Sequence, residues 1–218
     1  LMQIHNPDAD LAAAAEQLAL LREWKAQDVF RYVGVTHFQA AANERLIALM
    51  ERETLDVVQV NYSMAERSVE RRLLAAAAAT GTAVLVNLPF ARGKLFAAVR
   101  GKQLPDWAAE FGAASWAQFF LKYVLAHDAV TCVIPGMDKP EYVQDNLEAA
   151  RGRLPDAALR GKMADLLDAM RVRAPSDDDS CNRSDALQNL DGLLRRPEVP
   201  IYSAAIRLNP FYALALRN

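Results

Sequence analysis

Residues 55–60, Leu-Asp-Val-Val-Gln-Val, form a short apolar run that decides the fold class of this chain. Its three valines are β-branched residues, which favour strands. The run is apolar at successive positions rather than alternating, which is typical of a strand buried on both faces of a parallel sheet. Helical patterns precede and follow it, over residues 40–52 and 65–80. A strand placed between two helices in this way predicts parallel strands joined by right-handed crossovers.

The same alternation continues in both directions along the chain. Strand-like runs are predicted at 1–5, 30–36, 55–60, 82–86 and 130–134, and helices at 11–25, 40–52, 65–80, 116–125 and 140–149, with a loop over 87–94. An open doubly wound sheet and a closed barrel both fit this order. No glycine-rich phosphate fingerprint follows a strand, which counts against a dinucleotide-binding open sheet.

Polar residues and one glycine gather at the ends of these strands, where a barrel places its active site. They are His5, Thr36, His37, Asn61, Asn87 and Gly136. A complete barrel has eight strands and about 250 residues, so five strands cannot close one. The expected fold is therefore α/β, a partial (β/α)8 TIM barrel of about five parallel strands with outer helices. The chain also begins directly in a strand, without an initiator Met, and we expect that the opening strands are missing from it.

Composition narrows the class of protein further. The 218 residues are 52% hydrophobic and 24% charged, with a net charge of −2, which is ordinary globular composition without the positive field of a nucleic-acid binder. Two cysteines, Cys132 and Cys181, make neither a disulfide framework nor a zinc motif, so no metal site is expected. No apolar run is long enough for a membrane span, and a cytoplasmic location is expected.

The character of the chain changes after residue 173. Residues 174–180, Ala-Pro-Ser-Asp-Asp-Asp-Ser, have the composition of a linker. We therefore divide the chain into a barrel portion, residues 1–173, and a tail, residues 174–218. A short helix is expected at 187–194, whereas residues 200–218 are apolar without a firm period and receive no assigned structure.

Several single residues have both a structural and a chemical interpretation. A lone histidine such as His5 is more often a core or rim residue, but at a strand end it can donate to a carbonyl oxygen or transfer a proton. Gln59, on a strand of valines, either ties two strands together or holds a ligand amide. The turn from Val133 to Glu141 is either a plain connection or an anion site, because Gly136 allows close backbone approach and Lys139 adds positive charge.

Five segments taken together resemble the aldo-keto reductase family. They are LMQIHNP (1–7), YVGVTHF (32–38), VQVNYS (58–63), VLVNLPFARGKLF (84–96) and VIPGMDKPEYVQDN (133–146), and they follow the order and spacing of the family. The resemblance covers residues 1–173, corresponds to the C-terminal two-thirds of the family, and is nearest to its bacterial branch. It implies hydride transfer from NADPH to a small-molecule aldehyde or ketone.

The resemblance also implies roles for individual residues. His5 matches the catalytic histidine, whereas the family's Asp, Tyr and Lys belong to strands before Leu1. Thr36, His37 and Gln59 would face the nicotinamide carboxamide, and Asn87 falls where many members stack a tyrosine on the nicotinamide ring.

The remaining cofactor contacts would come from two later segments. The loop 88–95, with Leu88 and Phe90, would lie over the pyrophosphate. The segment 136–139, which includes Gly136 and Lys139, would meet the adenosine end together with Asn146. Met137 and Tyr142 replace a Ser and an Arg that often bind the 2′-phosphate, so NADP is the expected cofactor and NAD stays open.

Three hypotheses about function follow. The first is an NAD(P)H-dependent carbonyl reductase represented by an incomplete chain. The second is a non-catalytic nucleotide-binding or regulatory protein that kept the cofactor side of the site. The third is a product that does not fold alone. In each case the exposed edges of a partial barrel favour self-association, and neither nucleic acid nor a membrane is an expected partner.

Overall fold

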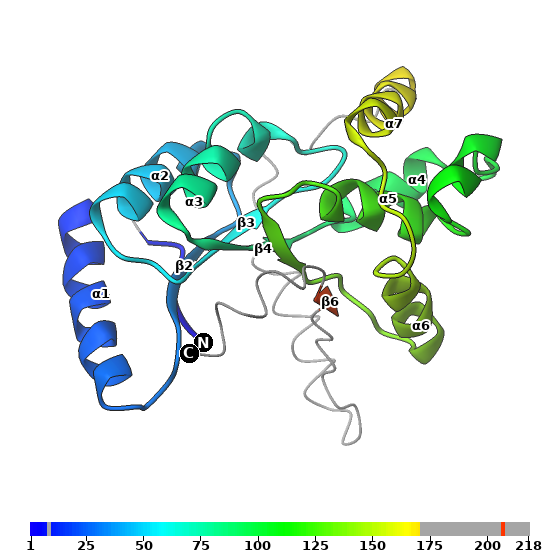
Figure 1. Ribbon diagram of the computed structural model, residues 1–218. Coiled ribbons are helices and arrows are strands. Elements are labelled where there is room, and N and C mark those ends of the chain that lie inside the picture. The colour runs from blue at the N-terminus through cyan, green and yellow to red at the C-terminus, as the bar shows by residue number, and fades with distance from the viewer. Residues whose placement is uncertain (8–9, 171–205, 208–218) are drawn as a thin grey trace, which may run out of the picture.

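The central element is a parallel β-sheet whose strands follow one another in sequence order. The computed structural model describes residues 1–7, 10–170 and 206–207. The strands β1 to β5 pair as parallel neighbours in the order β1-β2-β3-β4-β5 (Figure 1). They span Met2–His5 (β1), Val33–His37 (β2), Val57–Asn61 (β3), Ala83–Asn87 (β4) and Val130–Val133 (β5). The expectation of five parallel strands with flanking helices is confirmed.

A sixth strand lies at one edge of this sheet. β6, Ile206–Arg207, pairs antiparallel with β5, with Cys132 opposite Arg207. This strand was not predicted, because two residues carry no periodicity. The predicted domain boundary at 173/174, the linker 174–180 and the helix 187–194 lie outside the described residues.

Seven α-helices occur among the described residues, and four 3-10 turns accompany them. The helices span Leu11–Ala26 (α1), Asn43–Arg52 (α2), Leu73–Thr80 (α3), Lys94–Ala98 (α4), Trp116–Leu125 (α5), Pro140–Glu148 (α6) and Ala157–Ala169 (α7); the 3-10 turns are Ala40–Ala42, Ser68–Glu70, Ala91–Gly93 and Asp106–Phe111. Helix α7 was not among the predicted elements. None of the helices in the described ranges is long and apolar enough to cross a membrane.

The helix predicted over 65–80 is shorter than expected. Its first part is a turn, because the hydroxyl Oγ of Ser63 accepts a hydrogen bond from the backbone N–H of Glu66 at 3.0 Å. The carboxylate of Glu66 then accepts one from the N–H of Ser68 at 2.9 Å. Side chains that bond to nearby backbone in this way compete with helix formation. Helix α3 therefore begins at Leu73, and it ends where expected, at Gly81 with a φ of 70°.

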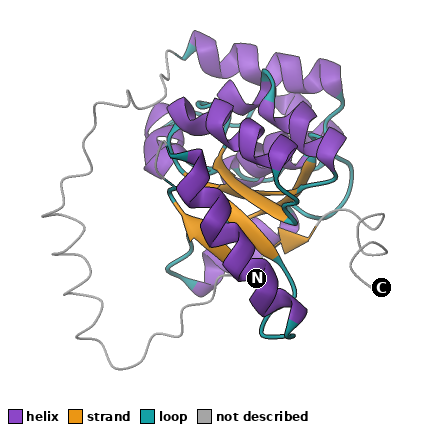
Figure 2. Ribbon diagram, turned by 90° about the vertical axis from the view of Figure 1, so that its left-hand side faces the viewer, coloured by secondary structure: helices purple, strands orange, loops and turns teal. Residues whose placement is uncertain are grey.

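One face of the sheet is covered by helices. Val35, Val58 and Val84 lie side by side in register, and none of the three has exposed surface. Helices α1, α2 and α3 run side by side along this face (Figures 1 and 2). Gln59 and Leu85, which follow Val58 and Val84 by one residue, lie on the opposite face and are only half-buried. The sheet therefore has a helix-covered outer face and a more open inner face.

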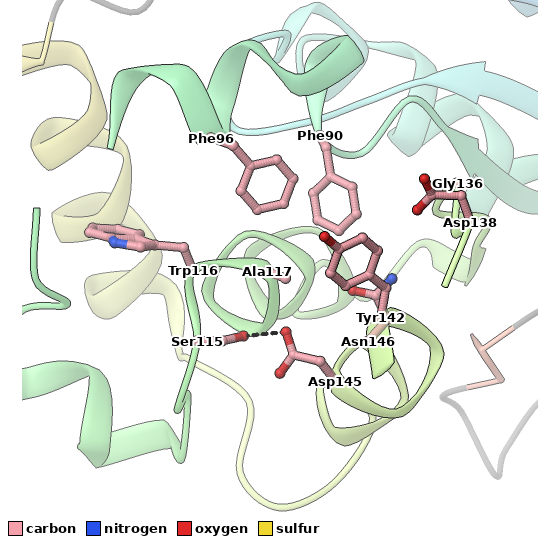
Figure 3. A pocket seen from close by; sticks show the side chains of 10 residues that line it. All are labelled: Phe90, Phe96, Ser115, Trp116, Ala117, Gly136, Asp138, Tyr142, Asp145 and Asn146. Carbon is pink, nitrogen blue, oxygen red and sulfur yellow. Dashed lines mark hydrogen bonds between the residues drawn. The ribbon is translucent and has the colours of Figure 1, made fainter. Parts of the chain in front are cut away.

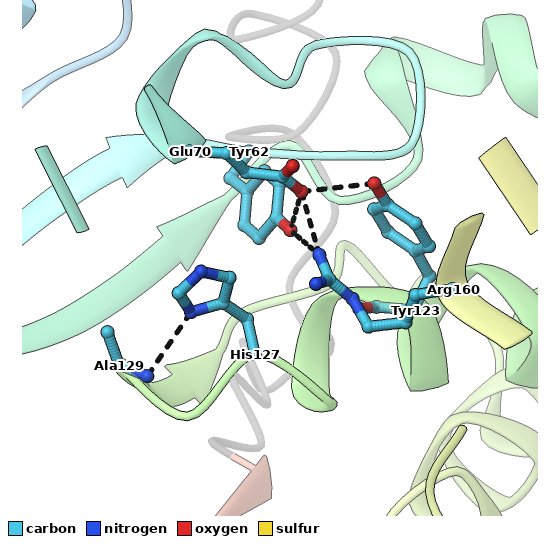
Figure 4. A network of polar contacts seen from close by, with 6 residues as sticks. All are labelled: Tyr62, Glu70, Tyr123, His127, Ala129 and Arg160. Carbon is cyan, nitrogen blue, oxygen red and sulfur yellow. Dashed lines mark hydrogen bonds and ion pairs between the residues drawn. The ribbon is translucent and has the colours of Figure 1, made fainter. Parts of the chain in front are cut away.

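A polar network fixes the position of α7 (Figure 4). The guanidinium of Arg160 donates to the hydroxyl of Tyr62 and to the carboxylate of Glu70, both at 2.7 Å. The hydroxyls of Tyr62 and Tyr123 also donate to Glu70. Burial raises the pKa of Tyr123 to about 12 and raises that of Tyr62 as well. Both phenols therefore stay protonated near neutral pH and donate to Glu70, while Arg160 connects α7 to Tyr62 after β3 and to the backbone of Tyr123 on α5.

Gly34 provides a test of how closely β2 and β3 pack. A Cβ atom at this position would lie 2.3 Å from the carbonyl oxygen of Val57, which is a backbone atom with little freedom to move. We predict that Gly34→Ala lowers the free energy of unfolding by about 3 kcal/mol, the upper end of ordinary overpacking costs. Denaturant unfolding measures this change as a lower midpoint.

Gly161 in α7 is the matched control, because a Cβ atom there meets no atom within 4 Å. Alanine has the higher helix propensity, so Gly161→Ala should stabilise the protein by about 0.5–1 kcal/mol. Equal midpoints for Gly34→Ala and the wild-type chain would contradict the close approach of the two strands.

Candidate functional site

The register of the sheet places three of the expected site residues in one row. His5 pairs with Thr36, and Thr36 pairs with Gln59. Partners in register point to the same side of a sheet, so the three side chains share the inner face at the carboxyl ends of β1, β2 and β3. His5 is exposed, and its Nε2 atom lies 3.3 Å from the side-chain nitrogen of Asn6. This row of His5, Thr36 and Gln59, the His5 row, presents an imidazole, a hydroxyl and an amide along one line.

Two asparagines form the next row towards the strand ends. Asn61 and Asn87 are register partners on β3 and β4. The side-chain oxygen of each is buried, and no donor within the described residues reaches it. A buried acceptor without a donor is costly, so these two atoms suit a ligand that brings N–H groups. A carboxamide is such a ligand.

His37 does not join the row. Successive side chains of a strand point to opposite faces, and Thr36 faces inward, so His37 lies on the helix-covered side. It is 6% exposed, and its Nδ1 atom accepts a hydrogen bond from the N–H of Gln39 at 3.1 Å. Its Nε2 atom lies 3.5 Å from the guanidinium of Arg45 on α2. Burial, and after it the charge of Arg45, lowers the pKa of His37.

The loop after β4 has a strained backbone. Leu88, Ala91 and Arg92 have φ values of 50°, 48° and 53°, in the left-handed region that residues other than glycine rarely adopt. Such residues cost on the order of 1–3 kcal/mol each and are concentrated at functional sites. The segment directs Phe90 against Phe96, with ring centroids 4.8 Å apart. The strain thus shapes one wall of a pocket.

This cavity, the aromatic pocket, lies where the loop after β4, the start of α5 and the start of α6 meet (Figure 3). Its volume of about 420 Å³ is within the range of small-molecule sites. Ten residues line it: Phe90, Phe96, Ser115, Trp116, Ala117, Gly136, Asp138, Tyr142, Asp145 and Asn146. Three of them, Phe90, Gly136 and Asn146, are among the cofactor residues expected from the sequence. Leu88 and Lys139 are not part of the lining, although the Lys139 ammonium lies 5.3 Å from the Tyr142 ring centre.

Asp145 connects the two helices that form the pocket. One of its carboxylate oxygens accepts from the hydroxyl of Ser115 at 2.7 Å, and the other accepts from the side-chain amide of Gln118 at 2.7 Å. The sequence prediction did not include Asp145, Ser115 or Trp116, and it covered Asp138 only as part of the segment 136–139. A usable signal was the spacing of Tyr142, Asp145 and Asn146, which are three and four residues apart and therefore share one helix face.

The described residues contain no group of three or more His, Cys, Asp or Glu side chains that could hold a metal ion.

Comparison with known proteins identifies the family. The family model described as "Aldo/keto reductase family" matches residues 1–160. The chain belongs to this family. A curated relative, the NADH-specific methylglyoxal reductase of Escherichia coli K12, is 23% identical over 181 residues, which are 71% of this chain and 55% of the relative.

Solved structures of aldo-keto reductases have the same fold. One from Bacillus halodurans has a TM-score of 0.61 at 21% identity, and covers 81% of this chain and 63% of its own. The glycerol dehydrogenase of Gluconobacter oxydans has a TM-score of 0.57 at 22% identity, and covers 81% and 60%. The chain thus spans less than two-thirds of the length of these relatives, and its sheet corresponds to part of their (β/α)8 barrel.

The lowered pKa of His37 predicts a pH dependence of stability. The unfolded histidine titrates near pH 6.5, whereas the folded one binds a proton only at lower pH. Below about pH 6.5 the unfolded state therefore binds more protons, and the free energy of unfolding should fall as the pH falls. Urea midpoints at pH 7.5 and pH 5.5 measure this slope.

The variant His37→Asn isolates the contribution of His37, because its side-chain oxygen can still accept from Gln39 but does not titrate. We expect a smaller loss of stability between the two pH values than in the wild-type chain. His127, whose pKa burial also lowers, retains its share in both proteins. An unchanged slope in His37→Asn would contradict the assignment.

Proposed function

We propose that this chain is the cofactor-binding part of an oxidoreductase that reduces aldehydes or ketones to alcohols with a nicotinamide dinucleotide. The observation that carries the proposal is the common placement of His5, Thr36 and Gln59 on the inner face, in a chain of this family. The aromatic pocket after β5 adds a cavity of suitable size for the other half of the same dinucleotide. A non-catalytic nucleotide-binding protein is the alternative.

Different residues would bind the two ends of the cofactor. The hydroxyl of Thr36 and the amides of Gln59 and Asn87 suit the nicotinamide carboxamide, because that group both donates and accepts hydrogen bonds. His37 was expected there too, but its location on the helix-covered face leaves it the role of supporting β2. When bound, the nicotinamide supplies the hydride.

The strained loop and the pocket would hold the other half of the cofactor. Arg92, in the loop after β4, places a positive charge suited to a pyrophosphate. The rings of Phe90, Phe96 and Tyr142 suit a planar base, since aromatic faces stack on heterocycles. Gly136 and Asn146 line the same pocket.

His5 would act on the substrate. Its exposed imidazole can donate a hydrogen bond to the carbonyl oxygen, which favours the negative charge that develops there during hydride transfer. Asn6, 3.3 Å from its Nε2 atom, would orient the ring. The family resemblance assigns the proton for the new alkoxide to a tyrosine that has no counterpart among the described residues. Tyr62 and Tyr123 do not fit this role, because both hydroxyls are bound to Glu70.

Carbonyl reduction tests the proposal. We expect residues 1–218 alone to bind the dinucleotide but not to reduce a permissive aldehyde above background. If a segment is encoded in frame before residue 1, the chain extended by that segment should be active. In that extended form, His5→Ala should lower the rate by about 10²–10⁴, as loss of a positioned acid/base or donor group does.

His127→Gln is the control, because His127 lies before β5 and contacts Tyr62 rather than the inner-face row. Activity of the extended protein that does not depend on His5 would remove the proposed role. Binding without any turnover in the extended protein would favour the non-catalytic alternative.

The choice between the two dinucleotides is a separate question. The sequence favours NADP through the family resemblance, whereas the Escherichia coli relative is NADH-specific by its name. The residues of the pocket itself bear on this choice.

A further inference from the structure

The charge of the aromatic pocket is negative. Two carboxylates, those of Asp138 and Asp145, are among its ten lining residues, and no Lys or Arg is. The two acids differ in their surroundings. Both oxygens of Asp145 accept hydrogen bonds from Ser115 and Gln118. The carboxylate of Asp138 is exposed and makes no hydrogen bond or ion pair to any residue in the described part of the chain.

Asp138 is placed to meet a ligand. It lies two residues after Gly136 and directly before Lys139, the N-cap of α6. Figure 3 shows it at the edge of the pocket, with its carboxylate directed towards the rings of Phe90 and Tyr142. A ligand whose base lay between these rings would bring its sugar close to Asp138.

Lys139 is the nearest positive charge in sequence, but it does not line the pocket. Its ammonium lies 5.3 Å from the centre of the Tyr142 ring, where a cation is attracted to the aromatic face. Lys139 therefore lies outside the lining, next in sequence to the carboxylate of Asp138. None of the lining residues offers a cation to bind the 2′-phosphate of NADPH.

We propose that Asp138 makes this site selective for NADH over NADPH. The inference rests on the proposed function, because it takes the pocket as the adenosine site. A carboxylate accepts hydrogen bonds from the two hydroxyls of an adenosine ribose. It repels the dianionic 2′-phosphate that replaces one of those hydroxyls in NADPH. The same carboxylate therefore favours one dinucleotide and rejects the other, which reverses the preference expected from the sequence.

Titration of the 218-residue chain with NADH and with NADPH tests this inference, with nicotinamide emission as the signal. We expect NADH to bind about tenfold more tightly than NADPH, which corresponds to one moderately screened charge repulsion. Asp138→Asn keeps the size of the side chain and removes its charge. It should therefore bring the ratio of the dissociation constants, NADPH over NADH, towards one, mainly through tighter binding of NADPH. Lys139→Ala removes the nearby cation and should increase the ratio.

Glu141→Gln is the matched control, because it makes the same change of charge on an exposed residue of α6 that does not line the pocket. Its ratio should stay close to that of the wild-type chain. A second readout is salt: raising the ionic strength to 0.5 M should reduce the wild-type ratio, because screening weakens charge repulsion but not steric rejection.

The outcomes separate the two proposals. Equal binding of both dinucleotides, tighter binding of NADPH, or an unchanged ratio in Asp138→Asn would overturn the role of Asp138 and leave the proposed function standing. A ratio that changes equally in Glu141→Gln would show a general effect of charge and would also overturn it. If neither dinucleotide binds, the proposed function fails, and this inference fails with it.

Discussion

Val35, Val58 and Val84 lie in register on the outer face of the sheet, with no exposed surface under the helices. Their burial fixes the register of three strands, because a slip of one residue would turn these valines to the open inner face and bring polar side chains under the helices. The alternation of side chains then determines the inner face as well. Thr36 and Gln59 follow the buried valines by one residue each, so they are brought into line with His5 on β1 without any direct contact being needed to place them.

The close packing of β2 on β3 is part of the same constraint. At Gly34 the backbone of β3 is too near for any side chain, and the carbonyl of Val57 occupies the space. Asp56, just before β3, accepts hydrogen bonds from the N–H of Val33 and from the ammonium of Lys25. Helix α1 and two strands are thus joined at the opposite end of the sheet from the His5 row, which leaves the carboxyl ends of the strands free for chemistry.

The aromatic pocket depends on contacts of another kind. Its wall of phenylalanines follows a loop whose backbone adopts left-handed angles at Leu88, Ala91 and Arg92, and other contacts must hold that loop in place. Asp145 accepts hydrogen bonds from Ser115, the N-cap residue of α5, and from Gln118 on α5, which lie 30 and 27 positions earlier in the chain. The pocket therefore exists only when β4, α5 and α6 are all in position. The two halves of the proposed cofactor site therefore differ in structure: one lies on the sheet, and the other lies at a junction of loops and helices.

The sequence by itself determined the five parallel strands, most of the helices and the family, because strand and helix periodicities are local properties of the chain. It also placed His5, Thr36 and Gln59 at strand ends. It did not show α7, whose Arg160 donates to Tyr62, just after β3, and to the backbone of Tyr123 on α5. It did not show β6. Neighbouring residues of a strand point to opposite faces, so Thr36 and His37 had to be on different sides of the sheet, but only the structure showed that His37 is the one under α2. Only the tertiary structure brought Asp138, Tyr142 and Phe90 around one cavity, because such a cavity is formed by packing between segments far apart in sequence, and no local pattern encodes that distance.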